Sequence, residues 1–293
     1  MLDNRVASGL LFSVCVLGQL YSSAALADPL SISEIQYTVA ADGASPQDGN
    51  VVDCLGGIVT FRSFGTQPRM YLQDPGAPDG WGAVMVKDWT GTLVNNVSEG
   101  DWVSLTGVLV EEHRGNTILQ YDSPNNPGFL VQSSANIIPA PRLVSVEDLR
   151  APSEDVPEFW LADNHDAEKY EAMWVTVTDV SVAALDLGKA SDNYSLLGAG
   201  GELWASDYLN QDTIGDYHIN ISLGQQLASV TGIVEQYTKI RDTYGWDYYQ
   251  VLTTSSKNLV VPEPSTSVLL TIVVALLGLR FGWRGRREQF HGQ

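Results

Sequence analysis

The sequence predicts an all-β protein with minor α content, built from two copies of one five-stranded barrel. Three observations lead to this prediction. Short strand-like runs dominate the middle of the chain, clusters of Gly, Pro, Asn and Asp separate them, and one strand pattern recurs about 124 residues later. Runs rich in Val, Ile, Tyr and Trp between turn residues are typical of small barrels and sandwiches. A recurring order of strands indicates a repeated domain.

The expected strands follow the same order in both copies. In the first copy they lie at residues 57–61, 69–73, 83–86, 102–110 and 117–120. The matching segments of the second copy are residues 194–197, 202–207, 221–236 and 248–251. The strongest match aligns 97–112 with 221–236, because both segments pass through Ser and Gly into an alternating run that reaches Thr-Gly and ends in Glu.

The long strand of each copy is interrupted by a Thr-Gly pair, Thr106-Gly107 or Thr231-Gly232. Glycine inside a strand permits a sharp bend, so that one strand can cross from one side of a barrel to the other. Five strands with one bent strand are the arrangement of the OB-fold. We therefore expect OB-fold-like barrels at residues 28–135 and 167–261, joined by a Pro-rich, acidic linker at 136–166.

Two short helical segments are expected next to the second barrel. Val146–Leu149 follows Ser145, a residue type that is favoured as an N-cap. Asp166–Glu171 is expected to form a helical turn that leads into the first strand of the second copy.

Several short motifs resemble the paired OB-fold modules at the N-terminal side of secreted bacterial nucleases. They are Ile32–Gln36, Gly57–Thr60, Met70–Asp74, Gly100–Gly107, Pro139-Ala140-Pro141 and Tyr170–Val175, the last departing from the pattern at Ala172. The resemblance covers about residues 30–260 and implies the fold rather than an activity, since fold does not determine function. In the resembling proteins a catalytic domain follows the OB pair, whereas here the chain passes from Val261 into its C-terminal segment. We therefore expect no nuclease activity.

The C-terminal segment, residues 262–293, has three parts in a meaningful order. Pro262-Glu263-Pro264 comes first, the uncharged run Val268–Leu279 second, and a cluster of arginines last: Arg280, Arg284, Arg286 and Arg287. Basic residues after an apolar run hold that end on the cytoplasmic side. The segment resembles the PEP-CTERM sorting signal, which implies an exosortase as a partner and processing near Pro-Glu-Pro. The alternative is a plain C-terminal membrane anchor, although a comfortable span needs about 20 residues.

The N-terminal 27 residues are typical of a signal peptide. Arg5 precedes the apolar stretch Val6–Leu20, and the small residues Ala25 and Ala27 predict cleavage by signal peptidase after Ala27. Lipoprotein processing at Cys15 is disfavoured, because Phe12-Ser13-Val14 is a poor lipobox. Both ends of the chain predict export to the cell surface or extracellular matrix, with a C-terminal membrane helix that is transient or retained.

The charge of the chain limits its partners. The whole chain has 16 basic and 35 acidic residues, and residues 28–264 alone have 11 and 33, a net charge of −22. DNA binding depends on cationic contacts to phosphates, so nucleic acid is an unlikely partner. Cys54 is the only cysteine after the signal peptide, and we expect it to be buried and structural.

Catalytic and metal-binding motifs are not evident in the sequence. His113, His165 and His218 are scattered without zinc-ligand spacing, and we interpret each as a loop or surface residue. No Gly-x-Ser-x-Gly motif or phosphate loop is present. We expect no enzyme and no cofactor, with an unrecognised hydrolase as the minor alternative. The loop Asp74–Gly80 contains two carboxylates, Asp74 and Asp79, so calcium binding by this loop is an open alternative. The preference of turns for Pro, Gly and Asp alone explains its composition.

The candidate ligand-binding residues lie in the hairpin between the last two strands of the second copy. They are Lys239, Arg241, Tyr244, Trp246 and Tyr248, together with Arg114 at the equivalent place in the first copy. An exposed aromatic face of an OB-fold can stack on bases or sugar rings, although core packing is the simpler explanation for most of the aromatic residues. The sequence thus predicts an exported, non-catalytic binding or structural module, with extracellular polysaccharide as a conceivable ligand. The alternative is a nucleic-acid-binding accessory protein.

Overall fold

The computed structural model describes residues 28–40, 42–64, 67–122, 127–149, 159–161, 165–185, 187, 193–209, 221–241 and 244–262. The predicted signal peptide with Ala25 and Ala27, and the tail beyond Pro262 with Glu263, Pro264, Arg284, Arg286 and Arg287, lie outside these residues. Within the described part of the chain, no helix is long and apolar enough to cross a membrane. The apolar run 268–279 lies outside the described residues.

The first barrel follows a short helix, α1 (Ile32–Gln36), which Ser31 and Glu34 cap reciprocally. Its strands are β1 (Val51–Ser63), β2 (Arg69–Gln73), β3 (Ala83–Lys87), β4 (Trp102–His113), β5 (Asn116–Gln120) and β6 (Gly128–Ser133), with the 3-10 turn η1 (Val94–Asn96) before β4. The strands pair in the order β1-β2-β3-β5-β4, and β4 pairs back with β1 to close the barrel. β3 and β5 are parallel, and β6 extends the sheet beside β4.

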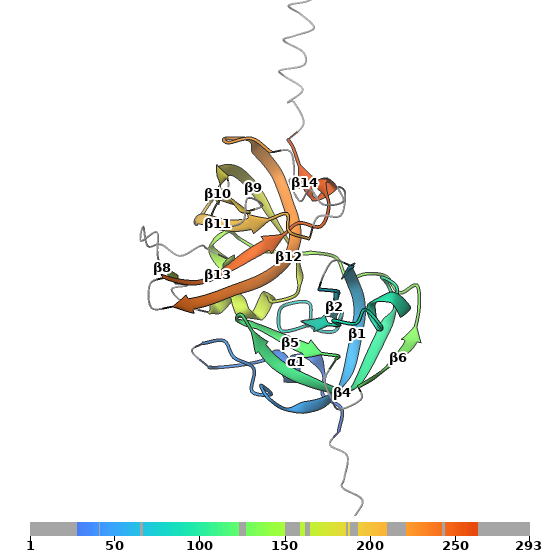
Figure 1. The fold of residues 1–293 in the computed structure, drawn as a ribbon. Helices are drawn as coiled ribbons and strands as arrows, with labels where there is room; N and C mark the ends of the chain where they lie inside the picture. Colours follow the sequence, from blue (N-terminus) through green and yellow to red (C-terminus); the bar gives the residue numbers. More distant parts are fainter. Residues whose placement is uncertain are drawn as a thin grey trace, which may run out of the picture.

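The second barrel repeats this order. Its strands are β9 (Trp174–Leu185), β10 (Asn193–Gly198), β11 (Gly201–Ser206), β12 (Gln226–Arg241) and β13 (Tyr244–Leu252), followed by η4 (Ser256–Asn258) and β14 (Leu259–Val260). They pair as β9-β10-β11-β13-β12, β12 closes onto β9, and β11 and β13 are parallel like β3 and β5. The prediction of two tandem five-stranded, OB-like barrels is therefore confirmed (Figure 1).

The segment expected to be a linker, residues 136–166, is partly built into the second barrel. It contains β7 (Arg142–Leu143), η2 (Glu147–Leu149) and β8 (Phe159–Leu161), and η3 (Asp166–Tyr170) follows. β7 pairs in parallel with β9, and β8 pairs in parallel with β13. The hydrophobic core of the second barrel includes Val144, Val146 and Leu149 of this segment. These apolar residues are interspersed with polar ones, so they can face the core even though prolines lie on both sides of the segment. Ser145 caps η2 as expected, accepting a hydrogen bond from the backbone N–H of Asp148.

The long strands change neighbours at the predicted Thr-Gly pairs. Residues 102–106 of β4 pair with β6, whereas residues 109–113 pair with β5. Gly107 lies between them with φ +65, and its N–H donates to Asp53 at 2.8 Å. In β12 the pairing with β9 ends at Ile233, where the pairing with β13 begins.

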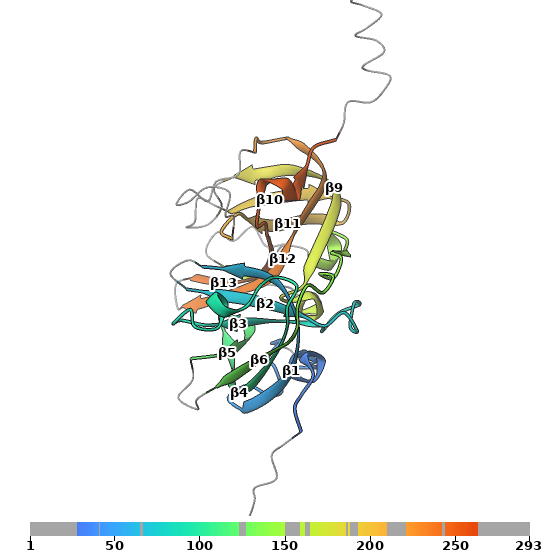
Figure 2. The same cartoon turned by 90° about the vertical axis from the view of Figure 1, so that its right-hand side faces the viewer.

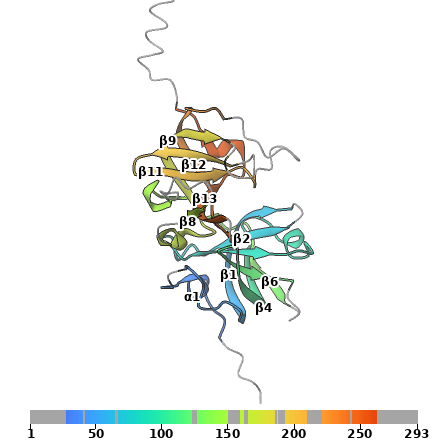
Figure 3. The ribbon, with the colours of Figure 1, turned by 60° about the vertical axis from the view of Figure 1, so that its left-hand side comes forward.

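The two barrels pack together through the outer face of the first one. Met70, Leu72 and Val86 belong to the core of the first barrel. Five side chains of the first barrel instead join the core cluster of the second: Phe61, Tyr71, Ala83, Met85 and Ile118. Figure 2 shows β13 beside β2 and β3 of the first barrel, and Figure 3 shows β12 and β13 on the side of the first barrel that carries β2. Cys54 is buried as expected, and burial raises the pKa of its thiol to about 11.

Candidate functional site

The ligand face of an OB-fold is formed by its second and third strands and the adjacent loops. In the first barrel this is the outer face of β2 and β3, where Tyr71 is fully buried and Met85 is 2% exposed. Because these side chains pack into the core of the second barrel, the first barrel uses its ligand face for docking within the chain.

Polar contacts hold this docked face in place. The hydroxyl of Tyr71 donates to Glu235 of β12, and Arg69 forms an ion pair with the same carboxylate at 3.3 Å. Arg69 also donates to the hydroxyl of Tyr208 at 3.2 Å. Burial, and then the charge of Glu235, raise the pKa of Tyr71 well above its ordinary value, so its hydroxyl remains a donor.

The turn between β4 and β5 is joined directly to β12. The side-chain amide of Asn116 donates to the carbonyl of Gln236 at 2.6 Å and accepts from its N–H at 2.9 Å. The N–H of Thr238 donates to the carbonyl of Arg114 at 2.7 Å. This turn would be a ligand loop in an isolated OB-fold, and here it extends the second barrel.

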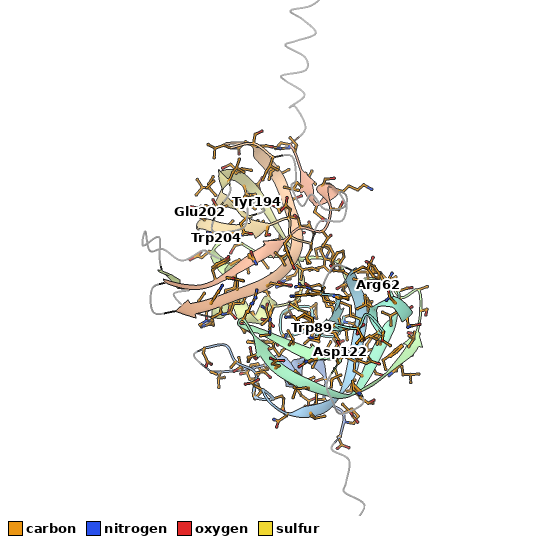
Figure 4. The ribbon with its side chains drawn as sticks, in the orientation of Figure 1. Arg62, Trp89, Asp122, Tyr194, Glu202 and Trp204 are labelled. Carbon is orange, nitrogen blue, oxygen red and sulfur yellow. The ribbon has the colours of Figure 1, made fainter. Side chains whose placement is uncertain are left out.

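The second barrel carries an aromatic cluster on β11, β13 and β12, of which β11 corresponds to β3 of the first barrel. Trp204 of β11 and Tyr248 of β13 have ring centroids 4.2 Å apart, and Tyr237 of β12 lies 5.7 Å from Tyr248. The guanidinium of Arg114, from the first barrel, lies 5.8 Å from the centre of the Tyr237 ring, within the range of a cation–π contact. We call Trp204, Tyr237, Tyr248 and Arg114 the aromatic face. Figure 4 shows Trp204 on the second barrel and Trp89 on the first.

The structure brings several of the sequence-predicted ligand residues together. Tyr248 and Arg114 both belong to the aromatic face, although Tyr248 is only 5% exposed. Lys239 is half-buried on β12, in register with Trp246, and Arg241 is in register with Tyr244. The structure does not describe the side chains of Arg241, Tyr244 and Trp246. The sequence reasoning missed Trp204 and did not select Tyr237, since their alternation resembles that of ordinary core positions.

A second feature lies on the other side of β13. A pocket of about 910 Å³ separates the segment after α1 from η2, η3 and β13. It is lined by Thr38, Val39, Ala40, Gly43, Trp81, Glu147, Asp148, His165, Asp166, Ala167, Glu168, Lys169 and Tyr249. Both barrels contribute to its walls, and no feature of the sequence pointed to it.

His165 lies in the loop before η3, and it also has a charged partner that the sequence did not predict. Its Nε2 lies 3.1 Å from the carboxylate of Asp247, which also accepts from Gln236 at 2.6 Å and Thr238 at 2.7 Å. Burial works to raise the pKa of Asp247, but the hydrogen bonds from His165, Thr238 and Gln236 outweigh it and lower that pKa. The sequence did contain a signal for this pair, because Asp247 stands among aromatic residues of a strand, where a buried charge needs a partner.

Among the carboxyl groups that line the pocket, Glu168 has the most strongly shifted pKa. Its Oε2 accepts from the hydroxyl of Tyr249 at 2.8 Å, and the side chain is 2% exposed. Burial, together with the charges of Glu112 and Asp247, raises the pKa of Glu168 to about 8, against the effects of Tyr249 and His165. A perturbed acid in a cleft is a functional-site candidate.

Neither the other histidines nor the proposed calcium loop belongs to the aromatic face or to the residues that line the pocket. His113 is the half-buried last residue of β4, not a loop residue, and burial followed by Lys87, Arg114 and Arg69 lowers its pKa to about 4. His218 lies outside the described residues. Asp74 accepts from the N–H of Gly76 at 2.7 Å, and Asp79 pairs with Arg142 at 2.6 Å. Among the described residues, no three His, Cys, Asp or Glu side chains are grouped to hold a metal ion. Calcium binding stays a prediction.

Comparison with known proteins identifies the C-terminal segment. The PEP-CTERM protein-sorting motif matches residues 260–287. The chain therefore carries the sorting signal of exported, exosortase-dependent proteins. β14 ends at Val260, and Val261 and Pro262 are exposed immediately after it, so the motif starts at the last strand of the second barrel. No curated protein matches the chain.

Solved structures with similar folds include several OB-fold proteins. One is a murine DNA-binding protein bound to double-stranded DNA, at 7% identity and a TM-score of 0.33, covering 69% of this chain and 99% of that one. A second is a replication protein A heterotrimer bound to ssDNA, at 10% identity and a TM-score of 0.24, covering 84% of this chain and 72% of that one. A third is fission yeast Pot1 with ssDNA, at 13% identity and a TM-score of 0.27, covering 74% of this chain and 84% of that one. Similarity at this level carries no conclusion about the ligand of this chain. The resemblance to secreted nucleases stays a prediction.

Proposed function

We propose that the protein is an exported, surface- or matrix-sorted binding module without catalytic activity, and that its ligand contacts the aromatic face of the second barrel. The sorting motif at residues 260–287 supports export and delivery. The PEP-CTERM segment would be processed by an exosortase, which is the partner that the motif implies.

One observation carries the location of the ligand site. The β2–β3 face of the first barrel is buried under the second. In the second barrel, the tilted rings of Trp204, Tyr248 and Tyr237 gather on β11, β13 and β12, apart from its main core, and Tyr237 is partly exposed. A pair of OB-folds packed in this way has one ligand face to offer rather than two.

Extracellular polysaccharide is the ligand that we propose. OB-folds bind oligosaccharides through their second and third strands and the adjacent loops, and a sugar ring packing on an aromatic side chain requires no positive charge. This is compatible with the net charge of −22 for residues 28–264. Arg114 and Lys239 border the rings and would donate hydrogen bonds to hydroxyl or carboxylate groups.

Binding of the secreted form to a glycan array and to purified exopolysaccharide tests this proposal. Tyr237→Ala and Arg114→Asn should each weaken binding at least tenfold, since they remove a stacking ring and a donor. Asn tolerates the positive φ of Arg114. Phe64→Ala, which removes an exposed ring of the first barrel outside the aromatic face, should leave binding unchanged. Equal losses in all three variants, or no glycan bound by the unmodified protein, would contradict the proposal.

Nucleic acid is the second candidate, because one observation favours it. Arg69, Lys87 and Arg114 gather near the junction of the barrels closely enough that each lowers the pKa of His113, although residues 28–264 hold only 11 cations. A gel-shift titration of single-stranded DNA across a salt series distinguishes the two candidates. A shift at micromolar protein that weakens with salt would replace polysaccharide by nucleic acid.

A further inference from the structure

Four apolar side chains are exposed at the end of the second barrel that carries β14. They are Leu197 (50% exposed) on β10, Leu223 (67%) in the loop before β12, Val260 (48%) at the end of β14, and Val261 (55%) after it. We call these four residues the end surface. Figure 1 shows β14 at the end of the second barrel that points away from the first barrel. The end surface is therefore separate from the junction between the barrels.

Strand pairing brings the first two of these residues together. Ser181 of β9 is paired with Leu197 of β10 and also with the first residue of β12. The loop that carries Leu223 is joined to the next residue of β9, because the N–H of Gly224 donates to the carbonyl of Val182 at 2.8 Å. Leu197 and Leu223 thus lie on either side of the same two residues of β9.

The end of β14 reaches the same place from the other edge of β12. Val260 pairs with Ser229, which is near the start of β12, and the two strands are antiparallel. Val261 therefore continues toward the start of β12, where the loop with Leu223 lies. Three segments of the chain present exposed apolar side chains at this one end of the barrel.

This end of the barrel also carries very little charge. The segments that form it, residues 180–185, 193–200, 221–234 and 251–262, contain no carboxylate and one cation, Lys257. Asp179 and Glu202 are exposed at its border. Residues 28–264 as a whole hold 33 acidic residues, so the end surface is a neutral region of a strongly acidic protein. Apolar surface that is grouped in this way is typical of a contact site.

The sequence places a segment directed to lipid immediately after this surface. Seven residues, 261–267, separate β14 from the uncharged run Val268–Leu279, and seven extended residues span at most about 25 Å. With that run in a bilayer, as the sequence predicts, the end surface stays within about 25 Å of the apolar core of the membrane. A short tether raises the effective concentration of the bilayer at the end surface, so a small apolar surface is enough for docking.

We propose that the end surface docks on the lipid bilayer into which the run 268–279 inserts, with its leucine and valine side chains entering the interfacial region. Removing these side chains from water is favourable, and the lack of carboxylates avoids repulsion from anionic lipids. A second copy of the chain fits less well, because a stable protein interface buries about 800 Å² on each partner and four side chains offer much less. Docking would hold the first barrel away from the membrane and leave Arg114 of the aromatic face accessible to a ligand.

Fluorescence quenching in vesicles tests this proposal. The chain of residues 28–293 is inserted into phosphatidylcholine vesicles with a polarity-sensitive dye attached at Leu223→Cys. Cys54 is buried and has a raised thiol pKa, so it does not compete for the dye. We expect the emission to shift to shorter wavelength and to fall by at least half when the acyl chains of the lipid carry bromine. Leu130→Cys, similarly exposed but on β6 of the first barrel, should show neither change.

A second substitution distinguishes docking from simple tethering. Leu197→Glu adds a charge to the end surface and should reduce the quenching of the Leu223→Cys label at least twofold, whereas Leu130→Glu should leave it unchanged. Equal quenching of the labels at positions 223 and 130 would show a tethered protein that does not dock, and would overturn the proposal. A wavelength shift without quenching would place protein rather than lipid over this end and overturn it too. A chain that fails to float with the vesicles would remove the insertion on which the proposal rests.

Discussion

Carboxyl groups are buried at the interface between the barrels and bond across it. Glu171 is fully buried, and its Oε1 accepts from the N–H of Thr117 at 3.0 Å and from the amide of Gln36 at 3.3 Å, both on the first barrel. Burial, followed by Glu168 and Glu112, raises the pKa of Glu171 well above its ordinary value. A protonated acid is less costly to bury than a carboxylate, so this interface favours the neutral forms.

The pH dependence of stability follows from these raised pKa values. The pKa of Glu168 is about 8 in the folded protein and about 4.5 when unfolded. Between these values the folded state holds the extra proton, so its stabilising effect is complete below pH 4.5 and is lost as the pH rises through about 8. The melting temperature should therefore fall from pH 5.5 to pH 9, and less steeply in Glu168→Gln than in Glu99→Gln, which removes an exposed charge. Parallel melting curves for the two variants would contradict this account.

Single residues also mark the limit of prediction from sequence. The helical turn at residues 166–171 was expected and is observed as η3. The role of its glutamates was not expected, because the partners of Glu171 lie 54 and 135 residues away. The partner of His165 was not predicted for the same reason, since Asp247 is 82 residues distant.

At the scale of elements, local patterns predicted most of the strands. β2 begins and ends where its alternating run does, and β4 and β12 follow the long segments that the internal repeat aligned. The exception is the region around β7 and η2, where prolines suggested a linker. Its apolar residues are buried by a core, and a short strand added in parallel to β9 has no local signature.

The Thr-Gly pairs require glycine for different physical reasons. Position 107 requires glycine because its backbone has a positive φ of +65. Position 232 requires glycine because there is no room for a side chain: a Cβ there would lie 2.5 Å from the carbonyl oxygen of Leu252. Gly107→Ala should cost about 1–2 kcal/mol, like Gly224→Ala, which has φ +77 and open surroundings. Gly232→Ala should cost about 3 kcal/mol, since backbone must move. Chemical denaturation measures all three, and equal costs at Gly107 and Gly232 would refute the distinction.

At the scale of the whole molecule, the two barrels form one folding unit. Five side chains of the first barrel lie in the core cluster of the second, and Asn116, Arg69 and Tyr71 bond across the junction. Separating the barrels would expose the apolar face of β2 and β3 and leave Glu235 without its partners.

A protein of residues 28–261, which holds both barrels, should therefore unfold in a single calorimetric transition. A fragment of residues 28–135 should melt at a lower temperature and bind a hydrophobic dye, because Tyr71, Met85 and Ile118 become exposed. Two separate transitions in the longer protein, with the first matching the melting of the fragment, would show that the barrels are independent.

The sequence by itself determined the two five-strand patterns, the bends at Gly107 and Gly232, the short helical turns and the sorting motif at 260–287. These features are local, because alternation, turn residues and short motifs act over a few neighbouring residues. Only the tertiary structure decided that the first barrel buries its ligand face, that Arg114 meets Tyr237, and that Glu168 lines a pocket. These depend on how one barrel docks on the other, and the contacts join residues too far apart in the chain for any local pattern to record them.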